Sequence, residues 1–468
     1  MPLILPGNVA SATASTTYEV ANSCRWNEPD DPSMLKTSAS GNQRTFTVSV
    51  WLKRSKLGAF MAFYSQVTDN NNYFMMNFQN SDKLDIHDLS GGAEQSNFRT
   101  TAVFRDTSAW YHIVCAVDTT QATEGNRFKI WVNGTQQTVF DNNAYPDQND
   151  DIDVNVSGEK TRVGAGYDTA GYHFDGYLAE VCSIDGTAYT ASDFGEFDED
   201  SPTIWKPKDV SGLTFGTNGF YLDFEDSSNL GNDANGGTDL TETNLAAADQ
   251  ATDTPTNNFC TFNTLHKHTN ITFSEGNCKW VSHASSDAYG GGIGTFGLTA
   301  GKWWWEVKIA STVANHNHGV ISELCPELYD LTEHASATGA LQIKTGVTCW
   351  LNDDGGEVRV DGTATTADYG LYSDGDIMGI ALDIDNYNIS YYKNGSALVS
   401  DFNMSTTRGT IFPFINTGVS TTTEVNFGGC SAFAISSAAN DANGHGVFEY
   451  APPSGFLALC TKNLGEEG

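Results

Sequence analysis

Two pairs of acidic residues have a spacing that suits hydrolysis of a glycosidic bond. Glu196 and Asp198 stand in EFDEDS, and Asp223 and Glu225 stand in YLDFED. The reaction needs two carboxyl groups, one acting as acid and the other as base or nucleophile. A Glu-x-Asp-x-x-Glu strand would supply them, but Ser201 takes the place of the second glutamate, and the other pair lacks a third carboxylate. We interpret both pairs as polar surface and predict that the protein is not an enzyme.

The segment DQNDDID, residues 147–153, offers the oxygen ligands that calcium prefers. Its candidate ligands are the carboxylates of Asp147, Asp150, Asp151 and Asp153. The segment lacks the glycine and the closing glutamate of an EF-hand loop. Two interpretations therefore stay open: a solvated acidic loop, or a calcium site. Calcium is the one cofactor that the sequence leaves open, and no other is expected.

Histidine, serine and tryptophan patterns point less clearly to chemistry. Alternate histidines in HKH (266–268) and NHNH (315–318) can share a strand face and bind a metal, but loop histidines are commoner. No G-x-S-x-G motif indicates a serine hydrolase. In KWWWEV, Trp303 and Trp305 face one side of a strand and Trp304 the other, so we expect mostly core packing, with one ring free to stack on a sugar.

Short strands separated by turn residues must position all of these groups. The stretch TFTVSVWLKR (45–54) alternates apolar and polar residues, as a half-buried strand does. Two hairpins carry Asn-Gly at 133–134 and 394–395, which suits a two-residue type I′ turn. The sequence predicts an all-β protein of two antiparallel β-sandwiches in series. We expect the hairpins to be scaffold, and the longer loops to carry binding.

Composition narrows the partners. The 468 residues carry a formal charge of −34, which argues against binding to nucleic acid. Nine cysteines, none in a CxxC pair, indicate buried thiols in a reducing cytoplasm. No 18-residue apolar run is present, so membrane insertion is not expected.

Two stretches resemble known families. AWYHIVCAVD, FKIWVNGTQ and HFDGYLAEVCSIDGTAYTASDF follow one another as in laminin-G and concanavalin-A-like domains, and the match covers residues 23–226. GKWWWEVKI, GDIMGIALDIDNYNISYYKNGSAL and IFPFINTG resemble SPRY domains over residues 263–464. Ala179 stands where many concanavalin-like relatives carry Asp.

The SPRY resemblance implies that loops at one end of the second sandwich hold a ligand. These loops contain SSDAYGGG, ANHNH and LNDDGGE. The candidate ligand-binding residues in them are Tyr289, His316, His318, Asp353 and Asp354.

The whole chain is similar to virion proteins of marine bacteriophages. The opening MPLILPGNVASATAS, the segment TDTPTNNF and the ending PPSGFLALCTKNL carry this resemblance. It implies a structural component of a tail fibre or head fibre that adheres to a host-surface glycan or protein, made in the host cytoplasm and located in the virion. Other virion proteins are the implied partners, and a homotrimer is implied by analogy with fibres. A capsid decoration protein without receptor, or a glycan hydrolase, are the alternatives.

These observations divide the chain into an attachment arm (1–22), a concanavalin-A-like sandwich (23–226), a polar linker (227–262) and a SPRY-like sandwich (263–468). Because Leu3, Ile4 and Leu5 are apolar and precede any sandwich, we expect the arm to dock on a partner.

Overall fold

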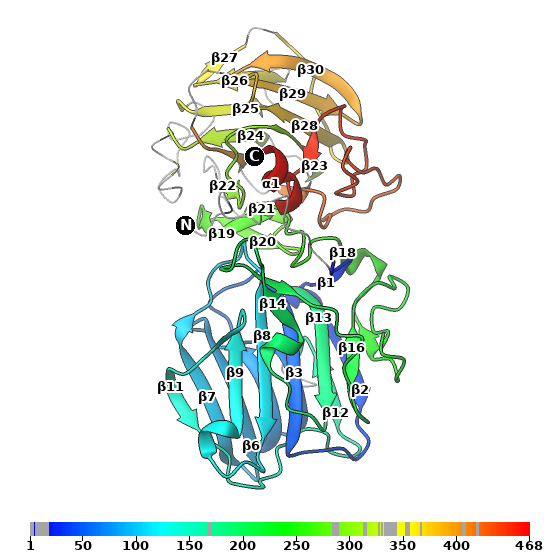
Figure 1. The fold of residues 1–468 in the computed structure, drawn as a ribbon. Coiled ribbons are helices and arrows are strands. Elements are labelled where there is room, and N and C mark those ends of the chain that lie inside the picture. The colour runs from blue at the N-terminus through cyan, green and yellow to red at the C-terminus, as the bar shows by residue number, and fades with distance from the viewer. Residues whose placement is uncertain are drawn as a thin grey trace. The chain divides into compact units, whose positions relative to one another are not determined.

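The computed structural model describes most of the 468 residues and divides them into two compact units. The described residues are 4, 18–166, 171–282, 290–311, 316–325, 328, 331, 344–351, 356–365, 367–404, 409–417 and 421–468. Residues 14–256 form the first unit. Residues 1–13 together with 257–468 form the second unit. Both are built almost wholly of antiparallel strands, as the sequence predicted (Figure 1).

The first unit contains two facing eight-stranded sheets. In order across the first sheet, the strands are β10 (Thr135–Gln136), β9 (Phe128–Val132), β8 (Tyr111–Asp118), β3 (Thr45–Arg54), β13 (Gly176–Asp185), β1 (Ser23–Trp26) and β18 (Gln250–Ala251), with β16 (Phe220–Leu222) also pairing with β13. Across the second, they are β11 (Phe140–Ala144), β7 (Ala93–Val103), β6 (Lys83–Ser90), β5 (Asn72–Phe78), β4 (Met61–Asp69), β12 (Lys160–Val163), β2 (Ser33–Thr37) and β17 (Thr241–Thr243).

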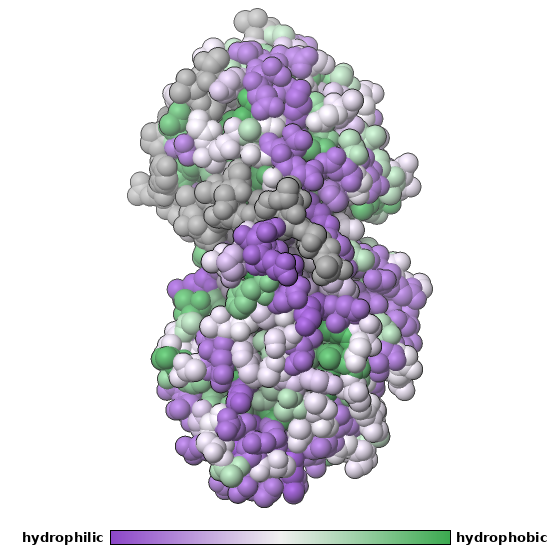
Figure 2. Space-filling view, viewed as in Figure 1, coloured by the Kyte–Doolittle hydropathy of each residue, from purple (hydrophilic) through white to green (hydrophobic). Residues whose placement is uncertain are grey.

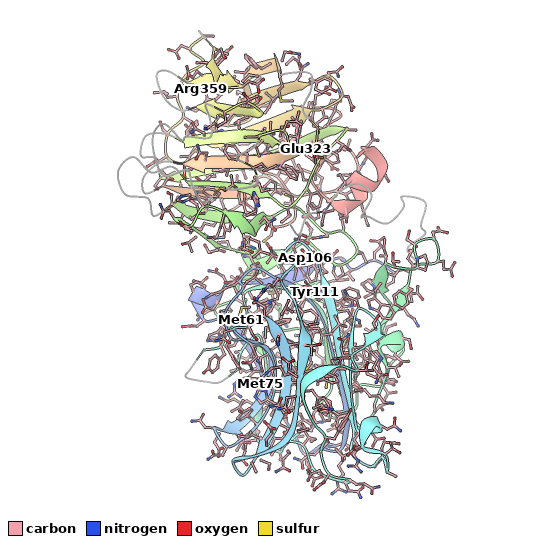
Figure 3. The ribbon with its side chains drawn as sticks, turned by 90° about the vertical axis from the view of Figure 1, so that its left-hand side faces the viewer. Met61, Met75, Asp106, Tyr111, Glu323 and Arg359 are labelled. Carbon is pink, nitrogen blue, oxygen red and sulfur yellow. The ribbon has the colours of Figure 1, made fainter. Side chains whose placement is uncertain are left out.

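Alternation of side chains explains how these sheets close on one core. In β3, Phe46, Val48, Val50 and Leu52 all join the central hydrophobic cluster. The second sheet also uses both faces: Met61 of β4 lies in the central cluster, whereas Met75 of β5 packs in a small cluster of its own (Figure 3). Because strand residues two apart share a face, the outer face of a sheet remains available for a further layer.

That further layer covers the outer face of the first sheet. It contains the short 3-10 turn Ala191–Asp193 and the hairpin of β14 (Gly195–Phe197) and β15 (Trp205–Pro207). A separate hydrophobic cluster forms beneath it from residues of β8, β9 and β13 together with this layer. The members of the cluster include Val114, Trp131, Cys182, Ile184, Phe194 and Phe215.

Residues 227–256 are part of the first unit, and the linker predicted there is wrong. Leu230 and Leu240 belong to the central core, and β17 and β18 extend both sheets. Asp253 is buried, where its carboxylate accepts hydrogen bonds from Lys53 Nζ at 2.7 Å and Trp110 Nε1 at 3.0 Å. The sequence of this segment resembles a linker because it is polar, and the partners of its buried polar groups lie far away in the chain.

The second unit also contains two main sheets. Across one, the strands are β19 (Phe262–Lys267), β22 (Gly290–Gly294), β31 (Ile411–Thr417), β24 (His316–Ser322), β25 (Val347–Leu351), β26 (Glu357–Val360) and β27 (Thr363–Ala364). Across the other, they are β20 (Ile271–Ser274), β21 (Lys279–Ser282), β32 (Thr422–Asn426), β23 (Lys302–Ser311), β28 (Ile377–Asp383), β29 (Asn388–Lys393) and β30 (Ser396–Asn403), with β33 (Leu457–Ala458) parallel to β23. Helix α1 (Thr461–Glu467) follows.

Ile4 of the predicted N-terminal arm does not stand apart from both sandwiches. Ile4 is buried in the core of the second unit and forms a parallel bridge with Phe296. Its backbone N–H donates to Thr295 O at 2.9 Å. The need of Ile4 for cover, which the sequence assigned to a partner, is therefore met inside the chain. Residues 1–3 and 5–17 lie outside the described residues.

The two Asn-Gly hairpins have the same construction, as predicted. Asn133 and Gly134 adopt φ of 47° and 73°, and Asn394 and Gly395 adopt 48° and 77°. In each turn the asparagine exchanges two hydrogen bonds with a neighbouring strand. Asn133 bonds in this way to the backbone of His112, and Asn394 to that of Ile377. Each turn is thereby fixed to the strand beside it.

The sequence also led to predictions about burial of the cysteines and about membrane-spanning helices. All nine cysteines are buried free thiols, which confirms the prediction made from their number and setting. No helix among the described residues is long and apolar enough to cross a membrane. On the face shown in Figure 2, hydrophilic residues predominate and hydrophobic ones form small separate patches.

Candidate functional site

The predicted SPRY ligand residues do not form a described surface. Tyr289, Asp353 and Asp354 lie outside the described residues, and the side chain of His316 does too. His318 was expected in a loop, but it lies in β24 and is buried. Its ring packs 5.4 Å from that of Tyr372 and 6.2 Å from that of Tyr391, measured between centroids. A ligand at the surface would not reach it.

The tryptophans of β23 are likewise internal. Trp303 and Trp305 join the core between the sheets, and Trp304 packs in a cluster on the other face. All three are almost fully buried, so none offers a ring for a sugar to stack on.

The acidic segment 147–153 spreads its carboxylates over different partners. Asp151 pairs with Arg44 at 2.6 Å on the exposed surface. The backbone N–H of Asp153 instead donates to the carboxylate of Asp88 on β6 at 2.9 Å. Asp147 and Asp150 lie in a turn, where the N–H of Asp150 donates to Asp147 O. Among the described residues, no three His, Cys, Asp or Glu side chains are placed to hold a metal.

The Asp88 and Asp153 carboxyls nevertheless form an unusual pair. Burial raises the pKa of Asp88 to about 8, and the Asp153 carboxylate adds to this effect. Burial raises the pKa of Asp153 to about 6. One carboxylate oxygen of each is buried without a hydrogen-bond partner among the described residues. The sequence pointed to Asp153 but gave no sign of Asp88, which stands far away in the chain.

The paired carboxylates considered for hydrolysis are engaged in local structure. Asp198 accepts hydrogen bonds from the backbone N–H groups of Asp200 and Ser201, and its pKa is lowered by them despite partial desolvation. Asp223 follows β16 and accepts from the N–H of Glu225. Asp198 and Asp223 thus cap turns.

A pocket that sequence reasoning missed lies between the outer layer and the first sheet of the first unit. Its volume is about 380 Å³. Three aromatic side chains give it its character: Trp131 from β9, Phe197 from β14 and Trp205 from β15. The remaining lining residues are Gly134, Thr190, Ala191, Ser192, Gly195, Glu196 and Lys208. Rings beside a few hydroxyl and charged groups suit a ligand with both apolar faces and polar edges.

A second pocket of about 300 Å³ adjoins the first, because Trp131 and Thr190 line both. Its other lining residues are Ala116, Asp118, Gln121, Asn126, Lys129, Ala188 and Tyr189. We call the two pockets together the aromatic groove. The groove follows β9, and its polar end carries amide and carboxylate groups that can bond to hydroxyls.

Trp205 is held by several contacts within the groove. A Cβ built on Gly134 would lie 2.3 Å from its ring, and one built on Gly195 2.6 Å, so only glycine fits at either position. Phe197 meets it edge-on, with centroids 4.9 Å apart. Its indole N–H donates to Nδ1 of His112 on β8 at 2.9 Å.

His112 also contacts Ser49, which raises the question of a catalytic dyad. Ser49 Oγ lies 2.8 Å from His112 Nε2. A serine nucleophile would need the histidine as base, held by a carboxylate on Nδ1. Here Nδ1 accepts an indole N–H, both residues are buried, and burial lowers the pKa of His112 to about 3. Such a histidine is too weak a base for that role.

Glu180 is a buried acid on β13 of the same sheet. It adopts φ of 48° where the pairing of β13 with β3 is irregular. Its carboxylate accepts hydrogen bonds from the phenols of Tyr18 at 2.9 Å and Tyr221 at 2.8 Å. Burial raises its pKa to about 7. Because Tyr18 and Tyr221 cover it, we assign Glu180 to anchoring the first residues of the unit.

The two units match different families. Residues 30–192 match the concanavalin A-like lectin/glucanases superfamily, and residues 302–430 match the SPRY domain. None of the curated proteins matches the chain. The chain is therefore an all-β protein in which a concanavalin A-like domain is followed by a SPRY domain.

Several solved structures share parts of this fold at low identity. The SPRY domain of human HERC1 is 16% identical, with a TM-score of 0.29 over 37% of this chain and 99% of that one. A heptameric SAP-like pentraxin from Limulus polyphemus is 14% identical, with a TM-score of 0.29 over 37% of this chain and 80% of that one. A proposed carbohydrate binding protein from Bacteroides ovatus is 16% identical, with a TM-score of 0.36 over 49% and 60%. The virion assignment stays a prediction.

Proposed function

We propose that this protein is a non-enzymatic adhesin of a bacteriophage virion, and that its first unit binds a host-surface glycan in the aromatic groove. The observation that carries the proposal is the set of aromatic rings, Trp131, Phe197 and Trp205, beside hydroxyl and carboxylate groups. Sugar rings present C–H faces that stack on such rings, and hydroxyl edges that bond to the polar groups. The lectin superfamily of this domain is consistent with such a ligand.

The charge of the chain supports an uncharged glycan. At −34, the protein repels a polyanionic chain at long range. Each pocket of the groove is lined by one carboxylate and one lysine: Glu196 with Lys208 in the first, and Asp118 with Lys129 in the second. The charges of the lining therefore balance. A neutral oligosaccharide pays the smallest electrostatic cost on entering such a site.

The groove supports binding over hydrolysis. Glu196 is the single carboxylate among the described residues lining the pocket with the three rings, and hydrolysis needs two. Asp118, in the adjoining pocket, accepts hydrogen bonds from Thr120 and Gln121, which lower its pKa against a desolvation effect. We therefore propose no enzymatic activity.

The virion setting rests on the resemblance of the opening, TDTPTNNF and closing segments to phage structural proteins. In that setting the chain assembles in the host cytoplasm, where its nine thiols stay reduced. Other virion proteins would be its partners, and we propose a homotrimer. Light scattering of the purified protein tests the trimer, and labelling of intact particles with an antibody tests the location.

Glycan binding is tested by titrating the full-length protein with neutral and acidic oligosaccharides in a calorimeter. Phe197→Ala should weaken binding roughly three- to tenfold, because an aromatic contact contributes about 0.5–1.5 kcal/mol. Phe197 is 44% exposed, so its removal should leave the fold intact. Tyr172→Ala, an exposed aromatic outside the groove, is the matched control and should bind as the wild type does.

Two results would contradict the proposal. Release of new reducing ends from a polysaccharide, abolished by Glu196→Gln, would make the protein a hydrolase. Incorporation into particles with no glycan bound would favour a decoration protein without receptor.

A further inference from the structure

The Trp205 ring of the aromatic groove is hydrogen-bonded to His112, a buried residue that does not line the groove. The indole N–H of Trp205 must be a donor, so the Nδ1 of His112 that receives it carries no proton. The proton of the neutral imidazole then lies on Nε2, from which it is donated to Ser49 Oγ at 2.8 Å. Ser49, His112 and Trp205 thus form one hydrogen-bonded series from β3 to β15.

The imidazole is itself held on every side. Its ring stacks on Trp51 of β3, with centroids 4.5 Å apart and planes 15° from parallel. The backbone N–H of His112 donates to Asn133 Oδ1 at 2.8 Å, and the backbone N–H of Asn133 donates to His112 O at 2.9 Å. The Asn-Gly turn, the imidazole and the indole therefore lie packed together, since the Trp205 ring leaves no room for a Cβ on Gly134 of that turn.

We propose that His112 is the positioning residue of the aromatic groove: as its Nε2–H tautomer, it fixes the Trp205 indole in the orientation in which a sugar ring stacks. The proposal rests on the proposed glycan-binding function. An aromatic ring that is already immobilised loses little rotational freedom when a ligand binds, so affinity is gained without a direct contact.

At low pH, the Trp205 indole N–H should remain the donor, and His112 Nδ1 the acceptor, of their hydrogen bond. Ser49, Trp51, Asn133, Phe194 and Trp205 surround the imidazole, and none of them titrates. On the β14–β15 hairpin that carries Trp205, Lys206 pairs with Glu196 at 3.7 Å and with Asp198 at 3.5 Å. Burial lowers the pKa of His112 to about 3, so Nδ1 remains an acceptor well below the pH at which an exposed histidine is protonated.

A double-mutant cycle on the full-length protein tests the proposal. His112→Phe keeps a ring against Trp51 and removes the acceptor, while Trp205→Phe keeps a ring in the groove and removes the donor. Each should weaken binding of a neutral oligosaccharide roughly five- to tenfold, the usual effect of losing one hydrogen bond. The double variant should bind no more weakly than the weaker single variant, since both changes break the same bond.

A second measurement does not need the ligand. The Trp205 indole resonance, assigned by its loss in Trp205→Phe, should be shifted by its hydrogen bond and stay unchanged from pH 7 to pH 4. The positioning role would be overturned if the losses of affinity in the two single variants multiplied in the double variant. It would also be overturned if the chemical shift of the indole titrated near pH 6.5. If the wild type binds no glycan, the proposed function fails, and the indole resonance still decides whether His112 fixes the ring.

Discussion

Substitution of Gly134 by alanine tests whether the close packing of the Asn-Gly turn against the Trp205 ring stabilises the first unit. Gly134 has φ of 73°, and a Cβ there would lie 2.3 Å from the indole ring. The backbone conformation alone costs an alanine about 1–2 kcal/mol. Displacing the indole breaks its bond to His112 and loosens its packing, which adds about 1–2 kcal/mol.

Gly58 provides the matched control in the same unit. Its φ is 69°, and nothing lies within 4 Å of a Cβ built on it. Gly58→Ala should therefore cost the backbone contribution alone. The difference of about 1–2 kcal/mol between the two variants corresponds to roughly 2–8 °C in melting temperature for a unit of this size.

Differential scanning calorimetry of the full-length protein measures both changes, and the transition of the second unit should stay where it is. Gly134→Ala should also weaken glycan binding, because it moves Trp205, whereas Gly58→Ala should not. The reasoning is refuted if the two variants melt together. It also fails if Gly134→Ala melts earlier but binds glycan normally, since the hairpin would then be scaffold alone, as the sequence suggested.

Further expectations concern titration, the N-terminal residue and the second hairpin. The Asp88 and Asp153 carboxyls hold protons in the folded state up to about pH 8 and pH 6, so folding stability should fall as pH rises from about 4 to 8. Asp88→Asn should reduce that fall by roughly 1–3 kcal/mol, and equal pH slopes of the wild type and the variant would contradict this. Ile4→Asp should lower the melting temperature of the second unit, since about 2–3 kcal/mol of burial is lost, and unchanged melting would show that Ile4 needs another partner. Gly395→Ala, whose Cβ would lie 2.7 Å from the Tyr450 ring, should lower the same transition and spare glycan binding.

The sequence predicted the fold well where local pattern decides it. The alternation in β3 and the Asn-Gly turns depend on neighbouring residues, and the strand and both turns were confirmed. The strand is buried on both faces, however, and not on one face alone as the alternation indicated. The linker prediction failed because Asp253 looks like a solvated residue until Lys53 and Trp110 meet it across the sheet. Burial of a polar group depends on its distant partners, which no local window contains.

The groove escaped prediction for a similar reason. Trp131 belongs to one hairpin and Trp205 to another, and the outer layer alone brings them together. A signal was present, because Phe197 and Trp205 flank an acidic turn in FDEDSPTIW. The interpretation of that turn considered its carboxylates and passed over its rings.

The chain path has a consequence for how such proteins can change. The second unit begins with residues 1–13 and resumes at residue 257, so the first unit is an insertion within it. The two ends of the insertion lie side by side, since β1 pairs with β18 and the N–H of Val20 donates to Thr256 Oγ1 at 3.1 Å. A segment with adjacent ends can be exchanged for another without stretching the surrounding fold. One recombination event could thus replace the first unit, to which we assign the proposed binding groove, while the second unit and its buried Ile4 are inherited unchanged.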